Sequence, residues 1–137
     1  MAWYLCTISS RSKENWHYCK KSSTWGIQTL GEYASKDRAR KNDNLLFWIG
    51  GVGYVGVAKV KRDTRVPSSD DEVPWAGGKQ RFGLIIPFNN LNEFENPLLF
   101  RFENRIQDKT GLDQSYFQRG YMPINDSVAN VVMKFLK

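Results

Sequence analysis

Hydrophobic residues form short segments with two distinct faces in the first half of the chain, a pattern typical of β-strands. The segment WYLCTIS, residues 3–9, is apolar on both faces, so we expect a strand that is paired or covered on both sides. Residues 44–62, NLLFWIGGVGYVGVAKVKR, predict two strands joined by a glycine-rich turn. RFGLIIPF, residues 81–88, predicts a further strand that is stopped by Pro87.

Helical patterns lie between these strands and at the end of the chain. A short helix is expected over about residues 13–21, with Ser10 or Ser12 as its cap, because a serine hydroxyl accepts hydrogen bonds from the free N–H groups. The almost wholly polar segment 35–42 predicts a second helix on the surface. The last segment, INDSVANVVMKFLK, begins with a capping Asn or Asp and carries an apolar stripe, so it predicts a terminal helix.

Two further segments have less regular patterns. Residues 64–80, TRVPSSDDEVPWAGGKQ, predict a loop by composition. Its carboxylates Asp70, Asp71 and Glu72 have no partners at metal-ligand spacing and are interpreted as a solvated acidic turn. Residues 97–106, PLLFRFENRI, fit a strand or a helix equally well. Mixed strands and helices without a repeat or a linker predict one α+β domain over residues 1–137.

Length and composition narrow the class of protein. A chain of 137 residues has the size of one domain with a real core. No apolar run approaches the roughly 20 residues of a membrane-spanning helix, and the first residues lack the basic start of a signal peptide. Cys6 and Cys19 are too few for a disulfide framework. We therefore expect an intracellular, cytoplasmic protein, most simply a monomer.

The basic residues are concentrated in the first half of the chain. Residues 1–65 hold 12 Lys and Arg against 5 Asp and Glu, whereas residues 66–137 hold 8 against 9. A basic face attracts phosphate backbones, although a merely solvated basic surface is the alternative. Aromatic residues make up 14% of the chain, and interleaved basic and aromatic residues suit proteins that stack bases while they hold phosphates.

The motif Gly51-Val52-Gly53-Tyr54-Val55-Gly56 matches the GxGxxG signature of dinucleotide sites. That signature requires a helix directly after the glycines, because the helix N-terminus holds the pyrophosphate. Here the glycines lead into an alternating, β-branched segment, so we interpret the motif as a hairpin turn. No cofactor is expected.

Catalytic and metal-binding patterns are also lacking. His17 is the single histidine, and neither cysteine has the basic surroundings of a nucleophile. The carboxylates do not have metal-ligand spacing. A binding module is therefore a better interpretation than an enzyme.

Three segments resemble EVE domains, small proteins of the PUA-like superfamily. They are ENWHYCKKSSTWGI (14–27), NDNLLFWIGGVGYVGVAKV (42–60) and QRGYMPINDSVANVVMKFL (118–136). The pattern is also similar to YTH domains, which read N6-methyladenine in RNA. This resemblance implies a curved, barrel-like β-sheet flanked by helices. It also implies a base, modified and flipped or already unpaired, in an aromatic pocket, with basic residues on the flanking phosphates.

Carried onto this sequence, the resemblance assigns the pocket residue by residue. Trp25, at the end of a helix and turn, is a wall of the aromatic cage, and Trp75, in the loop after the hairpin, is the second cage tryptophan. Asn15 reads a base edge, Gly26 offers a backbone group, and Ser10 ends the first strand beside the pocket. Trp25 as a core residue and Asn15 as a helix cap are the alternatives. The chain departs from YTH domains at Ser9, where they carry a lysine, and at Gly120, where they carry an acidic residue.

Other candidates follow from position and charge. Trp16 is expected in the core, and Trp48 faces either the pocket or a covering helix. The residues offered to phosphates are Arg11, Lys13, Lys20 and Lys21, and the resemblance adds Arg119 near the last strand, which could instead pair with a carboxylate. Two tryptophan faces on either side of a base would make a dry slot in which a methyl group counts.

The expected partner is nucleic acid, RNA or DNA, together with a possible separate effector protein. Two other functions remain open. One is a general RNA-binding PUA-like domain without modified-base specificity. The other is a small-molecule binder or enzyme that uses the aromatic pocket.

Overall fold

The computed structural model describes residues 1–28, 38–98, 112, 116–117 and 120–135. Six strands form one sheet in the order β2-β5-β4-β3-β1-β6. The strands are β1 (Trp3–Ile8), β2 (Thr24–Ile27), β3 (Asn44–Ile49), β4 (Gly53–Val60), β5 (Leu84–Leu98) and β6 (Tyr121–Ile124). The helices are α1 (Glu14–Ser22), α2 (Gly78–Arg81) and α4 (Asp126–Phe135), with 3-10 turns η1 (Ser10–Ser12) and η2 (Asp70–Glu72).

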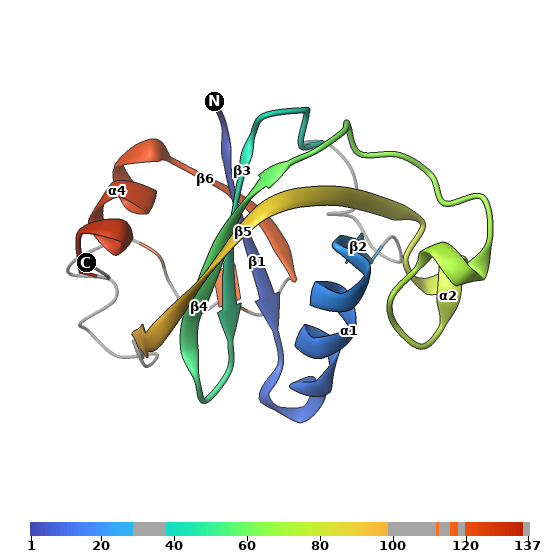
Figure 1. Ribbon diagram of the computed structural model, residues 1–137, viewed down its shortest axis with the longest axis horizontal. Coiled ribbons are helices and arrows are strands. Elements are labelled where there is room, and N and C mark those ends of the chain that lie inside the picture. The colour runs from blue at the N-terminus through green and yellow to red at the C-terminus, as the bar shows by residue number, and fades with distance from the viewer. Residues whose placement is uncertain (29–37, 99–111, 113–115, 118–119, 136–137) are drawn as a thin grey trace.

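The sheet is mixed and curled into a half-barrel (Figure 1). β1 pairs in parallel with β3, and all other neighbours in the sheet are antiparallel. In the figure the long β5 arches across the sheet, with α4 on one side of the molecule and α1 and α2 on the other. The predicted α+β fold is confirmed.

The sheet separates two hydrophobic cores. The α1-side core includes Trp16, Cys19, Trp25, Phe47, Trp75 and Phe82. The α4-side core includes Leu5, Leu46, Trp48, Phe117, Val128 and Val132. β1 contributes to both, because alternate side chains of a strand point to opposite faces: Tyr4, Cys6 and Ile8 lie in the first core and Leu5 in the second. The prediction of a strand covered on both sides is confirmed.

The hairpin and the terminal helix are also confirmed. β3 and β4 pair antiparallel, and the turn between them places Gly51 and Gly53 at φ +78° and +109°. Positive φ favours glycine, so the GxGxxG motif makes a turn into a strand and does not open a helix. On α4, Val128 and Val132 are buried as the apolar stripe predicted.

The start of α1 differs from the prediction. The residue at the N-cap is Lys13, which makes no side-chain capping bond, whereas Ser10 and Ser12 belong to η1. Ser9 Oγ accepts a hydrogen bond from the Arg11 N–H at 3.2 Å and so stabilises this 3-10 turn. The capping serine thus acts one turn earlier than expected, and the prediction that Ser10 or Ser12 caps α1 is wrong.

Trp25 and Gly26 lie on strand β2 and not on a turn that closes the helix. α1 ends where Ser23 adopts a left-handed conformation at φ +53°. β2 then pairs with β5, with Trp25 opposite Ile86. The composition of SSTWG favours a turn, but the hydrogen bonds that TWG forms with the distant strand β5 make it a strand.

The predicted surface helix at 35–42 is wrong for residues 38–42, and residues 35–37 lie outside the described residues. The backbone of this segment bonds to distant groups instead. The Ala39 N–H donates to Tyr121 Oη at 3.0 Å, and the Arg40 N–H donates to Asp43 Oδ2 at 2.8 Å. Ala39 is fully buried, so an entirely exposed helix is not compatible with this packing.

β5 does not stop at Pro87 but continues to Leu98. Residues 84–87 pair with β2, and Phe88 begins the pairing with β4. Pro87 therefore lies where β5 changes partners, and its carbonyl still accepts the Lys61 N–H at 2.8 Å. Proline removes only the donor of a ladder pair. Of the ambiguous segment 97–106, residues 97–98 belong to β5 and the others lie outside the described residues.

Within the described parts of the chain, none of the helices has both the length and the apolar character that crossing a bilayer requires.

Candidate functional site

A cavity of about 470 Å³ opens beside the carboxyl end of β1. Its walls come from the β1–α1 connection, β2, the β3–β4 turn and the segment that carries α2. The structure brings together six residues that the sequence placed in a base pocket: Ser10, Asn15, Trp25, Gly26, Trp48 and Trp75. The volume lies in the range of small-ligand sites.

An aromatic wall closes the cavity on the α1 side of the sheet. The ring of Trp75 meets that of Trp25 with a centroid distance of 4.8 Å and an interplanar angle of 88°. Phe82 lies 5.1 Å from Trp75 at 69°. Perpendicular rings in contact leave no slot between them, so the expected sandwich of a base between Trp25 and Trp75 is wrong for this arrangement. The two rings instead form a corner.

Trp75 is fixed by a hydrogen bond as well as by packing. Its Nε1–H donates to the backbone carbonyl of Asn15 at 2.8 Å. This bond joins the loop after the hairpin to the first turn of α1. A buried indole N–H needs such an acceptor, so the bond defines which edge of Trp75 faces α1.

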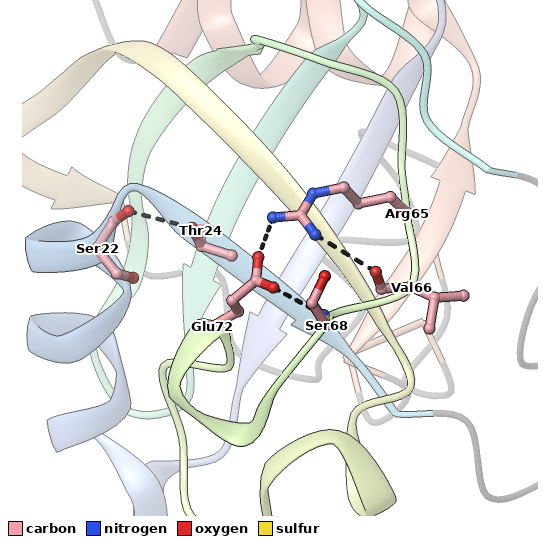
Figure 2. A network of polar contacts seen from close by, with 6 residues as sticks. All are labelled: Ser22, Thr24, Arg65, Val66, Ser68 and Glu72. Carbon is pink, nitrogen blue, oxygen red and sulfur yellow. Dashed lines mark hydrogen bonds and ion pairs between the residues drawn. The ribbon is translucent and has the colours of Figure 1, made fainter.

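Polar contacts organise the loop that carries Trp75. Figure 2 shows Arg65 bonded to Glu72 and to the carbonyl of Val66, while Glu72 also accepts the Ser68 N–H. Asp70 Oδ1 accepts the Lys79 N–H at 2.9 Å. Hydrogen bonds, first that from Arg65, lower the pKa of Glu72 to about 2. The predicted acidic turn is therefore solvated only in part, because Asp70 and Glu72 also accept hydrogen bonds from within the loop.

Asn15 and Gly26 approach the cavity from two elements. Asn15 is the second residue of α1, so it is not the helix cap, and its half-buried side chain borders the cavity. Gly26 is buried, and a Cβ there would lie 3.2 Å from atoms of both Phe82 and Trp75. The absence of a side chain at Gly26 therefore permits the aromatic wall.

Trp25 combines core packing with an unmet donor. It is 1% exposed, and among the described residues its buried Nε1–H has no hydrogen-bond acceptor. Buried donors are normally satisfied. The indole is both a core residue and a lining residue, so the two interpretations of Trp25 are compatible.

Trp16 and Trp48, two further tryptophans, differ in whether they border the cavity. Trp16 is 8% exposed and packs against Phe47 at 4.9 Å, away from the cavity lining, which confirms its place in the core. Trp48 borders the cavity and also packs against Phe117 at 4.8 Å in the α4-side core. It therefore meets the cavity from the opposite face of the sheet.

The described cations that were predicted to hold phosphates do not line the cavity. Arg11 and Lys21 are exposed, and Lys20 Nζ pairs with Glu93 at 2.9 Å while it lies 5.5 Å from the Trp16 ring centroid. Arg119 lies outside the described residues. Phosphate binding by these four residues stays a prediction.

Sequence reasoning missed Arg81, an exposed residue that lines the cavity. Its guanidinium carbon lies 5.3 Å from the ring centroid of Phe82. Lys13 is the other nearby cation, since its Nζ is 3.5 Å from the position that a Cβ of Gly51 would take. The one signal for Arg81 was the basic segment GGKQRF after Trp75. The sequence alone could not place this segment relative to the pocket.

Neither the two cysteine thiols nor the histidine lines the cavity. Burial raises the pKa of the Cys19 thiol to about 12 and that of Cys6 well above its usual value. Since the thiolate is the nucleophile, both are unreactive near neutral pH. His17 is exposed with its ring on Tyr18 at 5.6 Å. Among the described residues, no group of His, Cys, Asp and Glu is placed to hold a metal ion.

The sequence matches no protein-family model and no curated protein. Solved structures do match. A hypothetical protein from Leishmania major is 14% identical with a TM-score of 0.64, and the match covers 98% of this chain and 94% of that one. A protein from Pseudomonas putida is 12% identical with a TM-score of 0.62, over 99% and 100% of the two chains.

The Mmi1 YTH domain, in a crystal structure of its complex with RNA, is 13% identical with a TM-score of 0.60. The match covers 98% of this chain and 77% of that one. At these identities the likeness shows the fold. The protein therefore has a YTH-like α+β fold.

Proposed function

We propose that this protein is a non-catalytic nucleic-acid-binding module of the EVE type, which takes one modified base, flipped or unpaired, into the cavity. The observation that carries the proposal is the convergence of Asn15, Trp25 and Trp75 on one cavity from three separate parts of the chain. The Mmi1 YTH domain, which shares the fold, has been solved with RNA, and this favours RNA as the strand.

The corner of Trp25 and Trp75 supplies the stacking surface. Trp75 is 9% exposed and Trp25 only 1%, so the base lies against the accessible part of Trp75 and meets Trp25 at an edge. Full stacking on an aromatic side chain contributes about 1–3 kcal/mol per base, which is the upper limit here. A methyl group on that base buries further apolar area, worth roughly 0.8 kcal/mol. These terms offset the few kcal/mol that unstacking the base from its strand costs.

Polar groups around the corner select the base edge. The Asn15 amide offers both donors and an acceptor. The unmet Trp25 Nε1–H offers one donor in a buried setting, where a missing partner is costly. A ligand acceptor that reaches this N–H would therefore add more than a solvent-exposed bond.

Arg81 and Lys13, which lie beside the cavity among the described residues, bind the phosphates that flank the base. Arg81 is pre-oriented by Phe82, and the described residues offer neither cation an ion pair. Such contacts make binding weaken as salt rises.

The test measures binding of single-stranded and duplex RNA and DNA oligonucleotides that carry N6-methyladenine, 5-methylcytosine, 5-hydroxymethylcytosine or no modification. Trp75→Phe removes the bond to Asn15 and reshapes the corner, and Trp16→Phe is the matched control in the same core outside the cavity. We expect a preference for one modified base of about tenfold, equal to 1.4 kcal/mol, which Trp75→Phe reduces and Trp16→Phe leaves intact.

Asn15→Ala provides a second variant that leaves the core packing unchanged, and it should lower affinity for the preferred base. Equal binding of modified and plain oligonucleotides would contradict the proposal and favour a general RNA-binding domain. Binding of a ligand without phosphates, with little salt dependence, would favour a small-molecule site.

A further inference from the structure

A dense group of cations lies at the end of β3 remote from the cavity. It comes from two segments, residues 38–41 and 59–62, and consists of Arg38, Arg40, Lys41, Lys59, Lys61 and Arg62, all exposed. Lys41, Lys61 and Arg62 line an open groove together with Asp63 and Asn89. We call the surface formed by these six cations together with Asp63 and Asn89 the groove.

Backbone hydrogen bonds hold the two segments side by side. The Asn42 N–H donates to the Val60 carbonyl at 2.9 Å, and the Thr64 N–H donates to the Ala39 carbonyl at 3.0 Å. Asp63 Oδ1 accepts the Lys41 N–H at 2.8 Å. The cations are thus placed by a fixed backbone.

Among the described residues, none of these six cations forms an ion pair, and Asp63 is the one carboxylate that lines the groove beside them. The ion pairs among the described residues are Lys20–Glu93 and Arg65–Glu72, and neither belongs to the groove. The nearby Asp43 is buried and bonds to the N–H groups of Ala2 and Arg40. The excess of cations over the single carboxylate of Asp63 creates a positive potential that attracts polyanions.

The groove and the cavity are well separated. Lys41 precedes the first residue of β3, whereas Gly50 and Gly51 of the cavity follow its last one. Figure 1 shows these two ends of β3 at opposite ends of the sheet, at the top and the bottom of the view. Six residues of strand span about 20 Å, or about six phosphates at the spacing of one strand in a duplex.

We propose that the groove is a second, sequence-independent binding site for a nucleic-acid backbone, engaged by the same strand that places a base in the cavity. The positive charge of the groove favours phosphates as its ligands. That these phosphates belong to a nucleic acid rests on the proposed function. A concave groove with Asn89 in its wall suits a linear polyanion. A membrane surface is flat and is normally held by several apolar anchors, whereas the large apolar residues that are exposed among the described residues, Met1, Tyr18 and Val66, do not line the groove.

The test combines charge removal with strand length on unmodified single-stranded RNA. Lys61→Gln/Arg62→Gln removes two groove cations, and Lys79→Gln/Lys134→Gln removes two exposed cations that line neither the groove nor the cavity. For a strand of about 14 nucleotides, the groove variant should lower the salt slope by about 1.4 and the affinity on the order of tenfold, whereas the control should leave both unchanged.

A dinucleotide is too short to reach from the cavity to the groove even when its backbone is extended, so both variants should bind it like the wild type. Equal losses for short and long strands, or an unchanged salt slope in the groove variant, would overturn the inference. So would competition by poly-glutamate as strong as that by RNA. Loss of sedimentation with phosphatidylserine vesicles, without any change in RNA binding, would instead assign the groove to a membrane.

The two proposals fail separately. If the cavity does not select a modified base, the salt slope on the long plain strand still reports the groove. If the groove is inert, the modified-base preference of the wild type and its loss in Trp75→Phe still report the cavity.

Discussion

The cavity is lined by buried aromatic side chains, whereas the groove is lined by exposed cations. At the cavity, Trp25 and Trp75 are positioned by the core and by one indole hydrogen bond. At the groove, Lys41 and Lys61 are placed by the backbone and their side chains are free to move in water. Buried groups impose shape and so distinguish ligands, while exposed charges raise affinity for any polyanion.

This difference predicts separable effects of mutation. Variants of the cavity should change stability and ligand preference together, because the same side chains form the core. Variants of the groove should change salt dependence with little effect on stability, because exposed side chains contribute little to folding.

The largest effect is expected for Trp25→Ala. Removing a tryptophan that is 1% exposed should lower the free energy of unfolding by about 3–5 kcal/mol. Chemical denaturation measures this change. The salt slope on long plain RNA should remain that of the wild type under conditions where the variant is folded. A stability within about 1 kcal/mol of the wild type would show that Trp25 is not a core residue.

A smaller effect is expected for Gly26→Ala. The new methyl group would lie 3.2 Å from Phe82 and Trp75, and overpacking of this kind costs typically about 1–3 kcal/mol. Because the aromatic wall must shift, affinity for the preferred base should fall as well. Isothermal titration beside thermal unfolding checks both. Ala76→Gly, at an exposed loop position, is a control that should leave the wall in place.

The elements predicted from the sequence are those whose local pattern and tertiary role agree. The apolar segments in residues 3–9 and 44–60 predicted β1, β3 and β4, because strands that bury both faces are apolar on both faces. β2 was missed, since Thr24 and Gly26 favour a turn locally and become a strand through pairing with β5. Residues 38–42 look helical in composition but are held by Asp43 and Tyr121.

For the candidate site, the pocket residues were predictable from the sequence, but the cations beside the cavity were not. The resemblance to EVE domains selected five pocket residues from separate segments, and the structure places them around one cavity together with Trp48, whose side the sequence left open. Charge alone could not rank the cations. Lys20 is adjacent to Trp16 in space and is paired with Glu93, whereas Arg81 reaches the cavity from a four-residue helix. Only the tertiary fold decides which charges remain available.

The smallest effect concerns the loop network, and it depends on pH. The folded protein holds the pKa of Glu72 at about 2, below the ordinary value of 4.5. A depressed pKa contributes stability that is fully present above pH 4.5 and is lost as the pH falls toward 2. Glu72→Gln should therefore lower the melting temperature slightly at neutral pH. The difference from the wild type should shrink between pH 4.5 and 2.

Asp71→Asn is a suitable control for Glu72→Gln, since Asp71 is an exposed neighbour in η2. Its melting curve should follow the wild type across the same range. A constant difference for Glu72→Gln at every pH would mean that the carboxylate charge does not hold the loop.

The parallel pairing of β1 with β3 has a consequence for the order of folding. β3 and β4 are joined by a short turn and can associate early, whereas β1 must wait until the chain between Ile8 and Asn44 has returned to the sheet. Non-local pairing slows folding because loop closure precedes the contacts that reward it. The cavity draws on residues from Thr7 to Gly120, so we expect it to form among the last features, after the hairpin is already in place.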